Sequence, residues 1–76
     1  MPISTLPENV LARRIAKGIT RERLAVAADT SVSTIVRLER EGKAPSLAIL
    51  GRIADALDCD VAELLDGLPE TSETQP

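Results

Sequence analysis

The side chains best suited to bind a ligand in this chain are cations gathered in one part of it. Residues 13–43 hold eight Arg and Lys against four Asp and Glu, whereas residues 44–76 hold one Arg against seven Asp and Glu. The first stretch therefore carries a charge of +4 and the second −6, within a net charge of −3 for the chain. This asymmetry indicates that the basic stretch binds a polyanion. The alternative is that these charges are ordinary solvent-exposed side chains that bind no ligand.

The composition excludes several other kinds of chemistry. With no His, no aromatic residue and one Cys, the chain lacks ligands for a His/Cys zinc site, rings that stack on unpaired bases and an intrachain disulfide. Nucleophile–base pairs and a Gly-rich phosphate loop are also absent, so we predict no enzymatic activity, no metal and no cofactor. No apolar run approaches the roughly 18 residues of a membrane span, and no signal peptide is recognisable, which predicts a cytoplasmic protein without a membrane partner.

Five short helices are expected to position the cations. Seventy-six residues suffice for one small domain. The capping residues Thr20, Ser31 and Ser46 and apolar residues at helical spacing predict helices over residues 6–17, 21–28, 32–40, 47–57 and 61–66. Ile15 and Leu47 are among the side chains expected in the core. With no alternating strand pattern, the predicted fold class is all-α, a compact five-helix bundle.

The domain limits follow from these elements. Residues 1–5 are expected to form an N-terminal arm, residues 6–67 the folded domain, and residues 68–76, which are polar with two Pro, a disordered tail. That tail is too short for an effector domain, so no small-molecule effector is predicted.

The segment from Thr20 to Leu38 has the layout of a helix-turn-helix, in which the second helix enters the DNA major groove. More broadly, GITRERLAVAADTSVSTIVRLEREGKAPSLAILGRIADALDCDVAELL, residues 18–65, resembles the Cro/repressor-type (XRE, lambda-repressor-like) helix-turn-helix domain. The matching residues are Thr20, Leu24, Ala25, Ser31, Thr34, Ile35, Leu38, Glu39, Pro45, Ser46, Leu47, Ile53, Ala54, Leu57, Glu63 and Leu64. The resemblance covers about residues 8–66 and implies a bundle that binds operator DNA, commonly as a dimer, to regulate transcription.

The resemblance places the base-contacting residues on the exposed face of the third helix. Val32, Ser33 and Arg37 match the positions that meet base edges, and Thr34 and Val36 share the remainder of that face. Arg37 can donate two hydrogen bonds to guanine, a contact that discriminates by about 1–3 kcal/mol. The alternatives are a solvated surface arginine at Arg37 and ordinary first-turn residues at Val32 and Ser33.

Four further residues are expected to hold DNA phosphates, which position the protein without selecting a sequence. Thr20 and Arg21 begin the second helix, and Arg21 stands where the family usually has glutamine. Arg40 and Lys43 flank the end of the third helix, where compensation of the helix dipole is the alternative.

Two more features of the resemblance concern structure. Glu39 lies near the C-terminus of its helix, where an anion is disfavoured, and the family pairs it with an arginine on the first helix, which here is Arg14. We therefore expect a partly buried Arg14–Glu39 salt bridge. Asp29 stands where the family prefers Gly in the left-handed conformation.

The sequence thus supports two hypotheses. The first is a sequence-specific regulator that binds double-stranded DNA, is associated with the nucleoid, and forms a homodimer through Val61, Leu64 or Leu65 on the fifth helix. The second is an antitoxin-like or antirepressor-like module, whose main role is to bind a partner protein with its acidic half.

Overall fold

The computed structural model describes residues 5–65, which form five α-helices and one π-helical turn without any β-strand. In chain order the elements are α1 (Thr5–Lys17), α2 (Arg21–Ala27), α3 (Val32–Val36), η1 (Arg37–Glu41), α4 (Leu47–Ala56) and α5 (Val61–Leu64). The predicted all-α, five-helix fold is confirmed. The predicted tail, residues 68–76, and residues 1–4 of the predicted arm lie outside the described residues.

The predicted capping residues begin their helices. The side-chain oxygens of Thr20, Ser31 and Ser46 accept hydrogen bonds from backbone N–H groups three residues later, at 3.0, 3.2 and 3.2 Å. At α5, the Glu63 carboxylate accepts the N–H of Asp60 at 2.8 Å. Each bond satisfies a donor that has no partner within the helix, which explains why the helices start at these residues.

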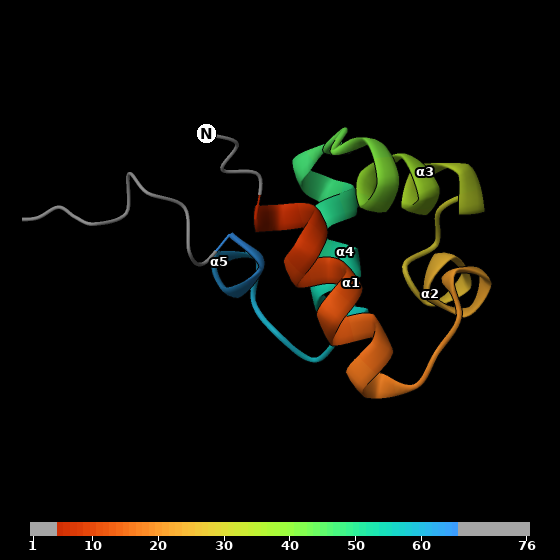
Figure 1. Cartoon of the computed structure of the whole chain (residues 1–76), viewed down its shortest axis with the longest axis horizontal. Helices are drawn as coiled ribbons and strands as arrows, with labels where there is room; N and C mark the ends of the chain where they lie inside the picture. The colour runs from red at the N-terminus through yellow and green to blue at the C-terminus, as the bar shows by residue number, and fades with distance from the viewer. Residues whose placement is uncertain (1–4, 66–76) are drawn as a thin grey trace, which may run out of the picture.

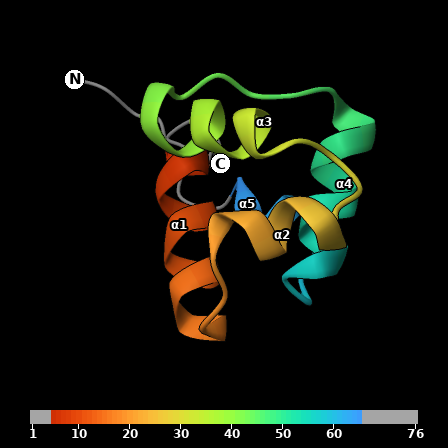
Figure 2. The ribbon, with the colours of Figure 1, turned by 90° about the vertical axis from the view of Figure 1, so that its right-hand side faces the viewer.

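The helices surround one core and leave α3 on the outside of the bundle. In Figure 2, α3 and η1 run along the top, between α1 on the left and α4 on the right, while α2 lies below them. Figure 1 shows α5 beside α1, on the side away from α2 and α3. The core consists of twelve buried apolar residues: Leu6, Val10, Leu24, Ala25, Ala28, Ile35, Leu38, Leu50, Ile53, Ala54, Leu57 and Leu64. Ile35 and Leu38 anchor the α3–η1 segment to this core with no exposed surface.

Two residues expected in the core are instead exposed, Ile15 by 62% and Leu47 by 73%. Ile15 follows the buried Val10 by five residues, and at 3.6 residues per turn this places it about 140° around α1 from Val10. Leu47 is the first residue of α4, and the buried stripe of that helix begins one turn later, at Leu50. Both predictions were wrong because they extended an apolar stripe beyond the part of the helix that neighbouring helices cover.

The third predicted helix divides into α3 and the wider turn η1. The Arg37 carbonyl accepts the N–H groups of both Gly42 and Lys43, the latter at 3.1 Å. Gly42 has φ 72°, a left-handed conformation that glycine adopts without a steric penalty. The helix therefore ends in a π turn at Glu41, so Glu39 and Arg40 lie on the wider part.

No helix within residues 5–65 has the length and apolarity needed to cross a membrane.

Candidate nucleic-acid interface

The three predicted base-contacting residues lie on the outer side of the α3–η1 segment. Val32 is 36% exposed, and Ser33 and Arg37 are exposed as well. At 100° per residue, Ser33 and Arg37 each lie about 160° around the helix from the buried Ile35, so the helical period turns both outward. Val32 follows the N-cap Ser31 and is exposed because it lies in the first turn, at the end of the helix. The segment thus presents a methyl-bearing side chain, a hydroxyl and a guanidinium on its surface.

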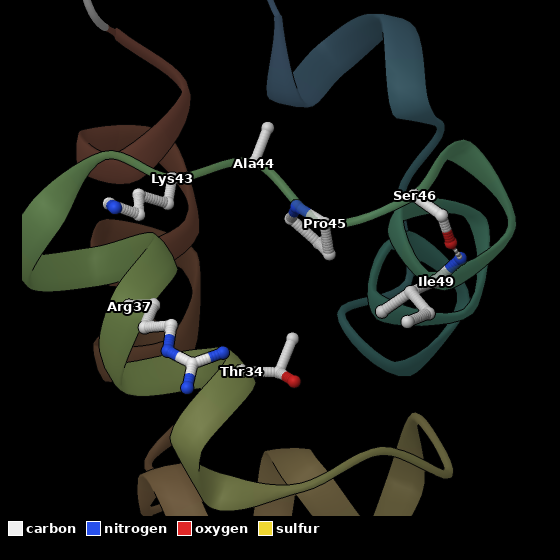
Figure 3. A pocket seen from close by; sticks show the side chains of 7 residues that line it. All are labelled: Thr34, Arg37, Lys43, Ala44, Pro45, Ser46 and Ile49. Carbon is white, nitrogen blue, oxygen red and sulfur yellow. Dashed lines mark hydrogen bonds between the residues drawn. The ribbon is translucent and has the colours of Figure 1, made fainter.

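Thr34 and Val36, predicted on the remainder of this face, are half-buried. The Thr34 hydroxyl lies 3.0 Å from the Ser31 hydroxyl, so these groups are engaged with each other at the start of α3. Thr34 and Arg37 line one side of an open hollow of about 280 Å³, and residues 43–46 with the start of α4 line the other side (Figure 3). This hollow therefore opens directly beside the Arg37 side chain.

Arg40 and Lys43, predicted to contact phosphates, are both exposed and form no ion pair within the described part of the chain. Arg40 lies on η1 and Lys43 follows Gly42, which ends that turn. Thr20, a third predicted phosphate contact, is exposed while its Oγ1 accepts the N–H of Arg23. Cations without a carboxylate partner attract a polyanion irrespective of its sequence.

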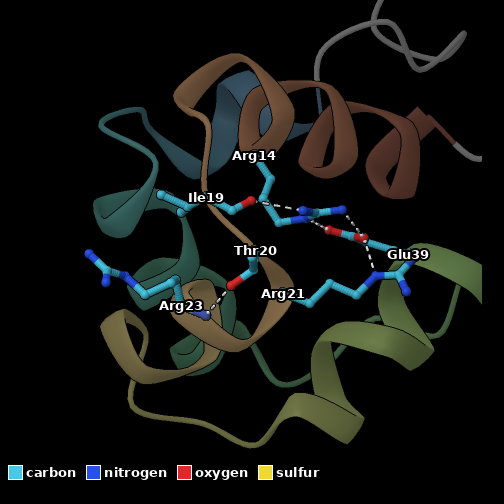
Figure 4. A network of polar contacts seen from close by, with 6 residues as sticks. All are labelled: Arg14, Ile19, Thr20, Arg21, Arg23 and Glu39. Carbon is cyan, nitrogen blue, oxygen red and sulfur yellow. Dashed lines mark hydrogen bonds and ion pairs between the residues drawn. The ribbon is translucent and has the colours of Figure 1, made fainter.

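Arg21, the fourth predicted phosphate contact, has a structural partner that the sequence analysis did not anticipate. Its Nε donates to Glu39 Oε1 at 2.9 Å. The expected Arg14–Glu39 pair is also present, with Arg14 Nε on Oε2 at 2.7 Å and an Arg14 terminal nitrogen on Oε1 at 3.1 Å. Figure 4 shows that the carboxylate lies between the two guanidinium groups. The network therefore joins α1, the start of α2 and η1.

Glu39 is held as a carboxylate by this network. Burial raises its pKa, but the hydrogen bonds from Arg14 and Arg21 and the positive charges of both arginines outweigh burial, so the pKa lies below its ordinary value of 4.5. The Glu39 side chain has no exposed surface. A fully buried carboxylate with two cationic partners is a fixed anchor point for η1.

The turn between α2 and α3 carries a second unanticipated contact. Asp29 has φ 55°, as the comparison with glycine at this position implied. Arg52, from α4, donates its Nε to the Ala28 carbonyl at 2.8 Å and a terminal nitrogen to the Asp29 carbonyl at 3.4 Å. The only feature of the sequence that sets Arg52 apart is that it is the one Arg or Lys after residue 43. The arginine ties the turn that sets the angle between the two helices to α4.

The predicted dimer residues differ in how much of their surface they offer. Leu64 has no exposed surface and belongs to the core. Its backbone carbonyl accepts a hydrogen bond from Asn9 Nδ2 at 2.7 Å. Val61 and Leu65 are half-buried. An interface at α5 can therefore use the exposed parts of the Val61 and Leu65 side chains.

Comparisons with known proteins agree with this geometry. Residues 10–64 match the sequence profile of the helix-turn-helix family. The structure is similar to the restriction-modification controller protein C.AhdI from Aeromonas hydrophila, with a TM-score of 0.75 and 29% identity over 82% of this chain and 94% of that one. It is also similar to the N-terminal DNA binding domain of SinR from Bacillus subtilis, with a TM-score of 0.78 and 28% identity over 92% of this chain and 99% of that one.

Among curated proteins, the chain is 30% identical over 73 residues to an uncharacterized HTH-type transcriptional regulator of Rickettsia prowazekii. A second such regulator, from Rickettsia conorii, shares the same identity over the same number of residues. These matches cover 96% of this chain but 56% and 58% of the two relatives, so the chain spans little more than half their length. The relatives are named as transcriptional regulators and not as enzymes. Because the family profile spans most of the chain and the arrangement of its helices agrees, this chain belongs to the XRE (Cro/C1-type) helix-turn-helix family.

Proposed function

We propose that the chain is a sequence-specific regulator of transcription, similar to a Cro-type repressor, which reads the major groove of double-stranded DNA with residues 32–40. The observation that carries this proposal is the outward position of Val32, Ser33 and Arg37 on a segment whose opposite side is anchored in the core. A helix in the major groove needs a few side chains that reach base edges from a rigid support. The α3–η1 segment meets both conditions.

Charge supports the same assignment. Arg37, Arg40 and Lys43 lie within seven residues of one another on η1 and the loop that follows it, and all three are exposed. The net charge of −3 disfavours binding of DNA over the whole surface. The local cations therefore orient the protein, and Arg40 and Lys43 contact phosphates while Arg37 contacts a guanine.

We further propose that the protein binds a two-half-site operator as a homodimer. One recognition helix offers few base contacts, whereas two placed one DNA turn apart, about 34–36 Å, bind together far more tightly. Val61 on α5 and Leu65, which directly follows α5, supply apolar surface for the interface. Leu64 contributes indirectly, because it fixes α5 to the core.

Selection of bound fragments from genomic DNA by the purified protein tests the proposal. We expect enrichment of a palindrome or of paired half-sites, and loss of that enrichment in Arg37→Ala. Lys17→Ala is the matched control, since it removes one positive charge at the C-terminal end of α1, away from α3 (Figure 2).

Two results would contradict the proposal: no enrichment by the wild-type protein, or equal enrichment by wild type and Arg37→Ala. A pull-down that then recovers a partner protein, with binding intact in Arg37→Ala, would favour the antitoxin-like or antirepressor-like alternative. In that case the partner is expected to meet the exposed carboxylates of Asp55, Asp58, Asp60 and Glu63 with basic side chains.

A further inference from the structure

The hollow beside Arg37 is lined by two cations that have no partner (Figure 3). Arg37 on η1 and Lys43 in the loop after it are exposed, and neither side chain forms an ion pair or a hydrogen bond with another residue between 5 and 65. Ser46 adds a hydroxyl, whose oxygen accepts the Ile49 N–H at 3.2 Å, so its hydrogen remains to donate to a ligand. These groups therefore suit an anion.

The remainder of the lining is apolar. It includes Ala44, Pro45 and Ile49, of which Pro45 and Ile49 are half-buried. An inorganic anion leaves this apolar surface in contact with water, whereas a ligand that also carries an apolar group covers it. The hollow therefore has the chemistry of a site for an organic anion.

The core holds both sides of the hollow in place. Thr34 and Arg37 each directly precede a core residue of the α3–η1 segment, and Ile49 directly precedes the core residue Leu50 on α4. The site is therefore formed before any ligand binds, as is usual for small-molecule sites. Its volume is about 280 Å³, and a water molecule occupies about 30 Å³ of the liquid. The ligand that fits has about ten non-hydrogen atoms.

We propose that the hollow binds a small phosphate monoester with an apolar group, and that this ligand competes with DNA. A phosphate monoester carries a charge of about −1.5 to −2 at neutral pH, which matches the two cations. The Arg37 guanidinium donates two parallel hydrogen bonds to the phosphate oxygens, and the apolar group lies against Pro45 and Ile49. Arg37 then cannot contact a guanine, so the ligand releases the operator. The competition rests on the proposed function, whereas the site itself does not.

The proposal changes one expectation from the sequence. No small-molecule effector was predicted, because residues 68–76 are too few for an effector domain. The hollow needs no such domain, since it lies between the segment proposed to read DNA and the start of α4. Ligand and operator would thus use the same arginine, and each would lower the affinity of the other.

NMR titration of the isotope-labelled protein without DNA tests the site. The probe is phenyl phosphate, which has the predicted size, and inorganic phosphate is its purely polar counterpart. Phenyl phosphate is expected to shift backbone amide signals within residues 34–37 and 43–49. It should also bind at least about tenfold more tightly than inorganic phosphate, since only its ring covers the apolar lining.

Three variants separate the charge of the hollow from its apolar lining. Lys43→Ala should weaken both anions about threefold, as expected for an exposed ion pair. Pro45→Ala should weaken phenyl phosphate but not inorganic phosphate, because it removes apolar surface and no charge. Arg23→Ala is the matched control and should leave both affinities unchanged, since Arg23 is an exposed cation on α2 that does not line the hollow.

Fluorescence anisotropy at constant ionic strength tests the competition on the duplex selected from genomic DNA. Phenyl phosphate at about nine times its own dissociation constant should raise the apparent dissociation constant of that duplex about tenfold. Inorganic phosphate at the same concentration should raise it less.

Equal affinities for phenyl phosphate and inorganic phosphate would overturn the proposal, because the apolar lining would then play no part. Equal binding of phenyl phosphate by wild type and Lys43→Ala would overturn it as well. Phenyl phosphate that binds in the hollow without weakening the duplex would overturn the competition. If the wild-type protein does not distinguish the selected duplex from a scrambled one, the proposed function fails, and the titration without DNA still decides on the site.

Discussion

At the scale of single residues, Glu39 connects the interior of the domain with the surface proposed to meet DNA. Its side chain is fully buried, and both of its oxygens accept hydrogen bonds from arginines on other helices. Removal of one member of such a network leaves the other charges without a partner, which costs more than the network contributes when it is intact. The consequence is a residue far more sensitive to substitution than its position at the end of a helix suggests.

Glu39→Gln should lower the free energy of unfolding by about 2 kcal/mol. This is below the 3–5 kcal/mol of a fully buried pair, because the side chain of Arg21 is 34% exposed and its charge keeps access to water. Urea denaturation at neutral pH measures this change in the free energy of unfolding. Glu41→Gln is the matched control, since Glu41 is exposed and has no ion-pair partner among the described residues. Equal stabilities of the two variants would contradict the network described above.

The pH dependence of stability should report the same network. The pKa of Glu39 in the folded protein lies below its ordinary value of 4.5 because the arginine hydrogen bonds and charges outweigh burial. A carboxyl with a lowered folded pKa stabilises the fold above its unfolded pKa, and this stabilisation is lost as pH falls from about 4.5 through the folded pKa. The difference in Tm between wild type and Glu39→Gln should therefore be constant from pH 7 to about pH 5 and shrink at lower pH. A difference that persists unchanged to pH 3 would rule out this role for the carboxylate.

At the scale of elements, the turn between α2 and α3 sets the orientation of α3 on the bundle. Asp29 has φ 55°, a region that costs most residues with a side chain roughly 1–2 kcal/mol and costs Asp less. The turn is nonetheless well supported, since the carbonyls of Ala28 and Asp29 accept hydrogen bonds from Arg52. The conformation of this turn is therefore imposed by its neighbours and not by the residue at its centre.

Substitution of Asp29 should change stability in opposite directions according to the new side chain. Asp29→Gly is expected to raise the free energy of unfolding by up to about 1 kcal/mol, because the steric cost disappears and is only partly offset by the added freedom of the unfolded chain. Asp29→Val, which is β-branched, should lower it. Thermal unfolding followed by circular dichroism measures both, and a more stable Asp29→Val would contradict the strained turn.

The sequence predicted elements well where one residue determines one hydrogen bond. Thr20, Ser31 and Ser46 each cap a helix through their own side chain, so local sequence was sufficient. It failed where several elements act together. The π turn depends on both Gly42 and Lys43 reaching the Arg37 carbonyl, and the exposure of Ile15 depends on which helices cover α1.

The same distinction applies to the proposed site. The predicted helix accounts for the exposure of Ser33 and Arg37. The assignment of Val32, Ser33 and Arg37 as base contacts and the Arg14–Glu39 pair came from the resemblance to a family. The Arg21–Glu39 contact and the role of Arg52 did not. Both join residues more than 15 positions apart in the chain through arginine side chains, whose length allows many partners. Only the packed structure selects among those partners.

At the scale of the whole molecule, opposite charges are separated along the chain. The basic stretch, residues 13–43, contains α2, α3 and η1, and the acidic stretch contains α4 and α5. A protein of this kind should bind DNA in one orientation, with the exposed carboxylates of Asp55, Asp58, Asp60 and Glu63 away from the phosphates. This leaves α5 free to contact a second copy.

Leu65→Lys should convert the proposed dimer to a monomer, because it places a charge on the apolar surface that α5 offers. Sedimentation equilibrium gives the mass, and thermal unfolding shows that the variant is folded. Ala62→Lys is a suitable comparison on the same helix, since Ala62 is exposed and outside the apolar cluster. A wild-type protein that remains monomeric on a two-half-site duplex would contradict the dimer.

The central claim is that residues 32–40 contact base edges in the major groove, and protection of guanine N7 from methylation tests it most directly, because N7 lies in that groove. The measurement is made on the selected duplex at saturating protein, with wild type and with Arg37→Ala at a concentration that restores binding. The account predicts that wild type protects at least one guanine in each half-site and that Arg37→Ala leaves that guanine reactive. Tight binding by wild type with every guanine N7 fully reactive would contradict it.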